Sequence, residues 1–316
     1  MIGITALVPP EVIYACGERA LDLNNFVPYS KLNPRDKLCA WTAIWRDLVL
    51  RGEVKIDALV VIAGGDCNNA IVDGEKLELA GIRTLYLMYP FDGSKRLMRL
   101  QIQKLLNFLG GVKDRSIFKM ISKLKKQAMR LDELRVGGRA RAKDVFQIEV
   151  SSSDFMGDLR KYEEALNSVV EREGEINYKY RIALLGTPPI YPDFHDYLQS
   201  IGLHVVYDEM PYEFIRIGGR NLEEIAANYR NYTFARDIKF RLKFIENEIR
   251  KRDVQGIIHF QQFACHHKLE DPIFRQYFNK ELSIPYITIE ADLPSKTPEQ
   301  VKLRLDAFAE RLGGKL

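Results

Sequence analysis

Short apolar segments alternate with helix-like segments along this chain, and this alternation restricts its fold more than any other feature. In the first half, apolar runs of strand length lie at 2–8, 57–63 and 84–89, and the segments between them have helical spacing. Such alternation predicts a parallel sheet covered by helices, because a parallel connection needs a crossover long enough to hold a helix. The first half therefore predicts an α/β domain.

The same pattern restarts in the second half of the chain. Strand-like runs are separated by helix-like segments and followed by a closing helix, with strands at 181–186, 204–208, 256–260 and 286–290 and helices at 192–201, 222–252, 271–282 and 300–312. We predict two doubly wound, Rossmann-like domains with parallel sheets, 1–173 and 174–316, joined at a hinge at Glu173-Gly174. The length of 316 residues suits about two domains.

A helical and basic segment, about 94–172, extends the first of these domains. The glycines at 110–111 and the run GGRARAK at 137–143 interrupt it, and Ser151–Ser153 with Asp154 is predicted to cap a helix over 155–172. We interpret its Lys and Arg residues as solvated helix faces. The alternative is an anion-binding surface for a phosphorylated cofactor or an acidic partner.

Composition and charge argue against several classes of protein. The formal net charge of +4, from 47 basic and 43 acidic residues, describes a mixed surface and does not indicate nucleic-acid binding. No apolar run approaches the roughly 18 residues of a membrane span, and the N-terminus lacks the basic start of a signal peptide. Four widely spaced cysteines suit a reducing compartment, so we expect a cytoplasmic protein.

Two predicted strands lead directly into cysteines. IDALVVIAGGDC ends in Cys67, and DVQGIIHFQQFACHH carries Cys265. Ligands of open parallel sheets lie beyond the carboxyl ends of the strands, so both thiols are placed where a ligand would bind. Cys39, in a helix that we expect 33–36 to cap, could reach the same cleft.

The chemistry open to these thiols is narrower than for most α/β proteins. No dinucleotide-binding glycine motif, phosphate-binding loop or GxSxG nucleophile motif is present. Three thiolates suit an iron–sulfur cluster, in which a fourth iron would stay open to substrate, or zinc. The alternatives are ordinary buried thiols and a zinc site formed by Cys265 with His266 and His267.

The other candidate polar residues are interpreted more conservatively. Cys16, in the apolar run IYACG, is interpreted as a packed small side chain. We interpret His259 as a core residue and His195 and His204 as surface or packing residues. The neighbours of Cys265 that could hydrogen-bond around the site are His266, Gln261 and Gln262.

Taken together, the segments resemble the 2-hydroxyacyl-CoA dehydratase and benzoyl-CoA reductase family, in particular its cluster-bearing D-component-like subunit. The resemblance covers nearly the whole chain in the family's order. It is carried by PPEVIYACG, LCAWTAIWRDLVLRG, IDALVVIAGGDC, RIALLGTPPIYPDFHDYLQSIGLHVVYDE, GIIHFQQFAC, IPYITIEADLP and EQVKLRLDAFAERL.

This resemblance implies a specific cofactor and reaction. Cys39, Cys67 and Cys265 would hold a [4Fe-4S] cluster in the cleft between the two domains. An ATP-dependent iron–sulfur activator protein would deliver one electron at low potential, and the cluster would pass it to an acyl-CoA thioester as a ketyl radical forms. The activity would be that of a dehydratase-type lyase or a related reductase in an anaerobic cytoplasm, within a homodimer or a heterodimer with a related subunit.

Three departures from the family pattern, and two competing functions, accompany the resemblance. Cys16 stands where the family has alanine, Asn68 replaces the aspartate after the second cysteine, and the chain is shorter than typical members. Four cysteines are too few for a double cubane with six thiolates in one chain. The competing functions are a non-catalytic iron–sulfur scaffold or electron-transfer subunit of a larger complex, and a metal-free or zinc-bound α/β binding module.

Overall fold

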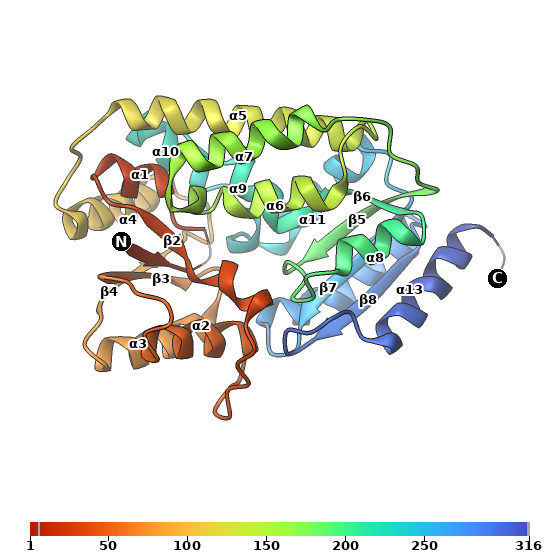
Figure 1. Cartoon of the computed structure of the whole chain (residues 1–316), viewed down its shortest axis with the longest axis horizontal. Coiled ribbons are helices and arrows are strands. Elements are labelled where there is room, and N and C mark those ends of the chain that lie inside the picture. The colour runs from red at the N-terminus through yellow and green to blue at the C-terminus, as the bar shows by residue number, and fades with distance from the viewer. Residues whose placement is uncertain (6, 315–316) are drawn as a thin grey trace.

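The computed structural model describes residues 1–5 and 7–314, and it contains two four-stranded parallel sheets (Figure 1). The strands of the first sheet are β1 (Ile2–Ile4), β2 (Ala20–Asp22), β3 (Ala58–Gly64) and β4 (Arg83–Met88), and those of the second are β5 (Tyr180–Gly186), β6 (Leu203–Asp208), β7 (Gly256–Gln262) and β8 (Tyr286–Ala291). The predicted α/β class with two Rossmann-like domains is confirmed.

The two sheets share one strand order. It is β2-β1-β3-β4 in the first sheet and β6-β5-β7-β8 in the second. In each sheet the second strand along the chain pairs with one side of the first strand, and the third strand pairs with its other side. The strand order therefore reverses between β1 and β3, where Ile4 pairs with Val60, and between β5 and β7, where Gly186 pairs with Phe260. Ligands of such sheets bind at this reversal point, beyond the strand ends.

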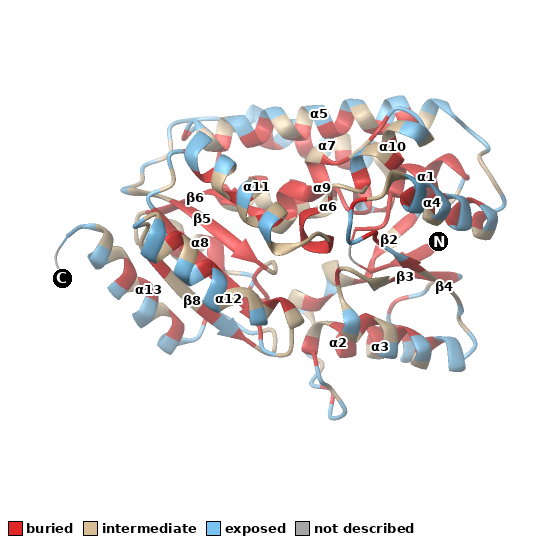
Figure 2. Ribbon diagram, turned by 180° about the vertical axis from the view of Figure 1, so that it is seen from behind, coloured by how far each residue is buried: buried red, intermediate tan, exposed pale blue. Residues whose placement is uncertain are grey.

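Helices cover the faces of both sheets. They are α1 (Pro10–Ala15), α2 (Ala40–Leu50), α3 (Asn68–Leu79), α4 (Lys95–Leu109), α5 (Ser116–Val136), α6 (Ala142–Ser151), α7 (Leu159–Glu171), α8 (Phe194–Ser200), α9 (Glu209–Arg216), α10 (Leu222–Tyr229), α11 (Ile238–Lys251), α12 (Asp271–Phe274) and α13 (Glu299–Leu312). Every residue of β7 is buried, as expected for a parallel strand with both faces covered. Figure 2 shows buried strands inside and exposed outer faces on α3 and α13.

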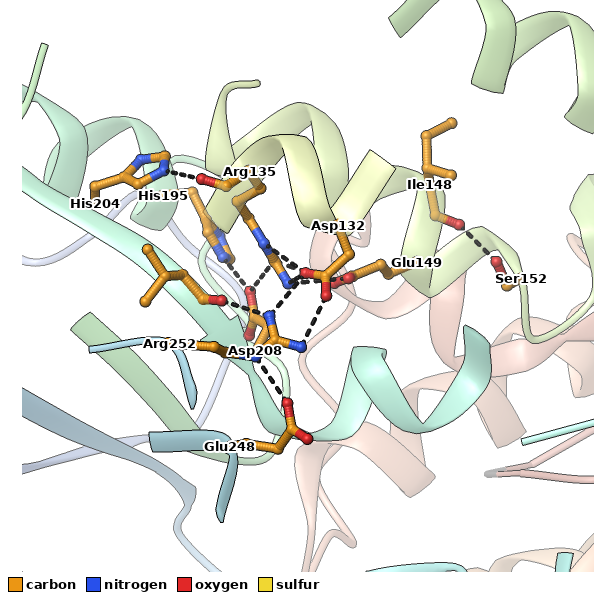
Figure 3. A network of polar contacts seen from close by, with 11 residues as sticks. Asp132, Arg135, Ile148, Glu149, Ser152, His195, His204, Asp208, Glu248 and Arg252 are labelled. Carbon is orange, nitrogen blue, oxygen red and sulfur yellow. Dashed lines mark hydrogen bonds and ion pairs between the residues drawn. The ribbon is translucent and has the colours of Figure 1, made fainter. Parts of the chain in front are cut away.

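Helices α5, α6 and α7 lie together over both sheets (Figure 1). Helix α5 packs against α1 from the first half of the chain and against β6 from the second. A buried ion-pair network joins α5 to α6 and to the second half of the chain (Figure 3). Asp132 of α5 accepts from Arg252 Nη2 at 2.8 Å, and Arg135 Nη2 lies 2.9 Å from Glu149 of α6. The helical segment is therefore part of the joint between the two sheets.

The predicted helix over 155–172 is wrong at its start. Helix α7 begins at Leu159, and Asp158, instead of Asp154, caps it by accepting from the N–H groups of residues 160 and 161. Phe155, Met156 and Gly157 have positive φ angles, which interrupt a right-handed helix. Residues 142–151 form α6. This helix was not predicted, because the charged run before it was interpreted as an interruption.

The long helix predicted over 222–252 is also wrong. The structure has α10 and α11, separated by a 3-10 turn at Thr233–Ala235. Asp237 starts the second helix, because its side chain accepts from Phe240 N at 3.0 Å. Helix α9, which follows β6 directly, was not predicted.

Two boundaries near the first sheet differ from expectation. The strand predicted over 2–8 ends at Ile4; Ala6 lies outside the described residues. Helix α2 begins at Ala40, so Cys39 precedes it as the N-cap residue and 33–36 does not cap it. The proposed hinge at Glu173-Gly174 lies in the loop between α7 and β5, and the domain boundary there stays a prediction.

Candidate functional site

Three cysteines from distant segments line one cavity of about 540 Å³. They are Cys39 before α2, Cys67 after β3 and Cys265 after β7. Two of the three follow the strands at which the order of each sheet reverses. The cavity is therefore shared by both halves of the chain.

The turn after β3 delivers Cys67. Gly65 has φ +88°, a conformation that side chains other than glycine rarely adopt, and a Cβ there would lie 3.1 Å from the Cβ of Ala235. Asp66 follows, buried, and accepts a hydrogen bond from Tyr232 OH at 2.7 Å. This tight turn places Cys67 at the N-cap of α3.

The turn after β7 delivers Cys265 in a comparable way. Its backbone N–H donates to the carbonyl of Gln262 at 3.0 Å, and Cys265 is the N-cap of the short 3-10 helix His266–Glu270. Asn69, from the loop of Cys67, donates from Nδ2 to the carbonyl of Ala264 at 2.9 Å. The loops of these two cysteines are thus tied directly to each other.

An ion pair holds the segment before Cys39 near the second sheet. Lys37 Nζ lies 2.6 Å from Asp292 Oδ2, just after β8. Gln262 Nε2 donates to the carbonyl of the same aspartate at 2.7 Å. Asp292 therefore connects the segment before Cys39 with the end of β7.

All three thiols stand at helix N-termini, yet burial dominates their acidity. Burial raises the pKa of Cys39, and it raises that of Cys265 to about 12. The pKa of Cys67 is raised well above its ordinary value by burial and then by the charges of Asp66 and the other two cysteines. Backbone N–H groups of the following helical turns act in the opposite direction. Without a bound cation these thiols stay protonated at neutral pH, whereas metal coordination deprotonates a thiol outright.

The donor set fits a cluster better than a single ion. Within residues 1–5 and 7–314, no three His, Cys, Asp or Glu side chains lie close enough to hold one metal ion. This geometry does not support a zinc site made by Cys265, His266 and His267. In a cubane cluster each cysteine binds its own iron atom, so the sulfur atoms surround a shared volume instead of one point.

The polar neighbours predicted around Cys265 divide into two groups. Gln262 and His266 line the cavity. Gln261 does not belong to the lining, and its Nε2 lies 3.1 Å from Nδ1 of His259. Successive side chains of a strand point to opposite faces of the sheet. Because Gln262 lines the cavity, its neighbour Gln261 points away from it.

Sequence reasoning missed Trp41 and Asn69 as lining residues, whereas it considered His267 as a candidate ligand of a zinc site. Trp41, Asn69 and His267 each follow a cysteine by two positions and line the cavity. The two-residue spacing was visible in the sequence. It indicates a shared site only because the structure places the three helix N-termini around one cavity. Asp66, directly before Cys67, was also missed.

The conservative interpretations of the remaining residues are supported. Cys16 is fully buried in the core. His259 is buried and lies 2.9 Å from Asp271 Oδ1. His195 and His204 are buried packing residues, contacting Asp208 Oδ2 at 2.7 Å and the Arg135 carbonyl at 2.9 Å.

Two buried carboxyl groups lie at the part of the cavity wall that β2 forms. Asp22, at the end of β2, lines the cavity, and its backbone N–H donates to Asp154 Oδ2 at 2.8 Å. Burial and then the charge of Asp154 raise the pKa of Asp22 to about 7, and burial raises the pKa of Asp154 to about 6. This pair can hold a proton near neutral pH.

None of the chain's described helices combines the length and apolar character needed to cross a membrane. A search of curated proteins found no match. The model of the family described as 2-hydroxyglutaryl-CoA dehydratase, D-component, matches residues 5–312. The chain therefore belongs to the 2-hydroxyglutaryl-CoA dehydratase D-component family, and it is a subunit of the 2-hydroxyacyl-CoA dehydratase type.

Proposed function

We propose that Cys39, Cys67 and Cys265 hold a [4Fe-4S] cluster and that the chain acts on an acyl-CoA thioester as a dehydratase-type lyase or a related reductase. An ATP-dependent iron–sulfur activator protein supplies the electron, and the chain works in a homodimer or a heterodimer with a related subunit. When bound, the cluster supplies one-electron transfer at low potential. The observation that carries this proposal is the presence of three thiols around one cavity at the reversal points of both sheets.

The cavity has the size and the walls that such a reaction needs. Its volume of about 540 Å³ falls in the range of small-molecule sites. Aromatic side chains, among them Trp41, Trp45 and Phe146, form part of the wall. Such walls exclude water, which protects low-potential electrons and reactive intermediates from side reactions.

Loss of water from a 2-hydroxyacyl thioester also needs a proton carrier. The reaction breaks the bond from C2 to the hydroxyl and one C3–H bond, so one proton leaves carbon and one reaches the departing oxygen. Asp22 lines the cavity and holds a proton on its carboxyl group near neutral pH. We assign both proton transfers to Asp22: its carboxyl group gives a proton to the departing oxygen, and the carboxylate so formed takes up the proton that leaves C3, with Asp154 setting the proton affinity of Asp22.

The test is anaerobic reconstitution with iron and sulfide, followed by analysis of iron, acid-labile sulfide and visible absorption. Wild type should bind about four irons in a [4Fe-4S] cluster, and Cys39→Ala, Cys67→Ala and Cys265→Ala should each lose it. Cys16→Ala is the matched control and should keep the cluster. A colourless wild type without iron and sulfide would contradict the proposal. A loaded protein without activity on acyl-CoA thioesters, even with its activator, would select a scaffold or electron-transfer role.

A further inference from the structure

The cavity wall carries buried N–H groups that have no partner among the described residues. The indole Nε1 atoms of Trp41 and Trp45 and the imidazole Nε2 of His267 are buried without a hydrogen bond. All three side chains line the cavity that also holds the cysteines. Trp45 is 1% exposed and His267 6% exposed, so bulk solvent does not satisfy them.

The position of each donor relates it to a thiol. Trp41 follows Cys39 by two residues, and Trp45 lies one turn further on the same face of α2. His267 follows Cys265 by two residues in the helix that this cysteine caps. Both groups of donors therefore lie within the first two turns of the elements that begin after Cys39 and Cys265.

The contacts of His267 hold its ring in place. Nδ1 lies 3.2 Å from Arg241 Nη1, which can only donate, and 3.2 Å from Glu270 Oε1. A neutral ring that accepts from Arg241 and a charged ring that donates to Glu270 both carry a proton on Nε2. Glu209, which lies 2.7 Å from Arg241 Nε, holds the arginine in place. In both of these states His267 presents an N–H group at Nε2.

Unsatisfied buried donors are costly, at about 1–3 kcal/mol each, and they mark the position of an absent partner. An indole N–H only donates, so the partner of Trp41 and Trp45 must accept hydrogen bonds, and Nε2 of His267 donates in the two ring states described above. Hydrogen bonds to the sulfur atoms of a cluster stabilise its more negative, reduced form and raise its reduction potential.

We propose that Trp41, Trp45 and His267 donate hydrogen bonds to the sulfur atoms of the cluster held by the three cysteines and thereby raise its reduction potential. The inference rests on the proposed function. It gives these side chains a positioning and tuning role, which differs from ligation and from contact with the substrate.

The test is a reductive titration of the reconstituted, substrate-free protein, followed by electron paramagnetic resonance. Trp41→Phe, Trp45→Phe and His267→Leu should each reduce the equilibrium constant for reduction about fivefold to tenfold, from roughly 1 kcal/mol per hydrogen bond. For a one-electron couple, tenfold corresponds to a shift of about 59 mV to lower potential. His267→Gln, which keeps an N–H donor, should restore most of the potential.

The direction of the shift separates this mechanism from simple loosening of the site. Admission of water would stabilise the reduced form and move the potential upward, opposite to loss of a donor. His204→Gln, at a buried histidine outside the cavity lining, is the control and should leave the potential unchanged. Iron and sulfide content must equal that of wild type in every variant compared.

One outcome would overturn this inference alone, and another would overturn the proposed function on which it rests. Fully loaded variants with an unchanged potential but a raised KM for the acyl-CoA would assign these donors to the substrate, and the inference would fail while the proposed function stands. Wild type that binds no iron and sulfide would remove the proposed function itself.

Discussion

The side-chain amide of Asn69 donates to the backbone carbonyl of Ala264 at 2.9 Å, across 195 positions of sequence. Asn69 lies two residues after Cys67, and Ala264 directly precedes Cys265. One hydrogen bond thus joins the two cysteine loops that come from different sheets. It sets the spacing of two of the proposed cluster ligands.

Asn69→Ala should loosen this joint. Loss of the bond should lower the free energy of unfolding by about 0.5–1.5 kcal/mol, and the reconstituted cluster should be released faster to an iron chelator. Release can be followed by visible absorption under anaerobic conditions. Asn68→Ala, at the exposed neighbour, is the control and should resemble wild type. Equal release rates for both variants would show that the bond does not hold the loops.

Arg241→Met should destabilise the protein strongly. Arg241 and Glu209 are both fully buried and joined by two contacts, at 2.7 and 2.9 Å, so removal of the cation leaves an unpaired buried carboxylate. The expected loss in the free energy of unfolding is about 3–5 kcal/mol, measured by urea denaturation of the apoprotein. Arg250→Met removes an exposed pair with Glu246 and should cost less than about 1 kcal/mol. Similar losses for both variants would contradict this account.

Asp22→Asn should change how stability depends on pH. Burial and Asp154 raise the pKa of Asp22 to about 7 in the folded protein, from an ordinary value of 3.8. The folded state therefore binds more protons between these values, and this group's contribution to stability falls as pH rises through that window. The limiting slope is about 1.4 kcal/mol per pH unit.

The asparagine variant lacks this titration, so its free energy of unfolding relative to wild type should increase from about pH 4 to about pH 7. Urea denaturation of both apoproteins across this range measures the difference. Glu163→Gln, at a surface residue paired with Lys123, serves as the control and should follow the pH profile of wild type. A constant difference between Asp22→Asn and wild type would mean that folding does not raise the pKa of Asp22.

Gly186→Ala should disrupt the pairing of β5 with β7. Gly186 has φ +90°, and a Cβ there would lie 2.3 Å from the carbonyl oxygen of Phe260. The backbone conformation alone costs about 1–3 kcal/mol for another residue, and the clash adds to it. Gly174→Ala, with no atom within 4 Å of its added Cβ, should be neutral or stabilising by up to about 1 kcal/mol. Thermal unfolding of the two variants gives the comparison.

Tryptophan fluorescence should report loading of the site. The chain has two tryptophans, Trp41 and Trp45, and both line the cavity of the three cysteines. A cluster that absorbs in the emission range should quench both, so fluorescence should fall in step with iron incorporation. Cys67→Ala should show no such fall. Fluorescence that stays constant while iron and sulfide enter wild type would place the cluster elsewhere.

Local pattern predicted most of the strands because their signal is contained within a few residues. The segment before Cys67 was predicted as a strand over 57–63 and is observed as Ala58–Gly64. The strand over 256–260 is observed as Gly256–Gln262. Buried parallel strands are uninterrupted apolar runs, so neighbouring residues suffice to find them.

Helix boundaries were predicted less well because caps and interruptions depend on tertiary contacts. The start of α11 depends on one carboxylate, Asp237, which accepts from a backbone N–H three residues later. The start of α7 depends on positive φ angles at 155–157, and a buried Phe155 accompanies them. A one-dimensional hydrophobic pattern contains neither the hydrogen bond nor the backbone conformation.

The sequence by itself determined the α/β class, the two parallel sheets, two cysteines that follow predicted strands and a third near the start of a predicted helix, because these follow from short-range periodicity and residue chemistry. Only the tertiary structure decided that the three thiols share one cavity, that Gln261 faces away while His267 faces it, and that Asn69 ties the two loops. These depend on strand order and on contacts across more than a hundred residues, where the free energy of packing selects one arrangement among many that the local pattern allows.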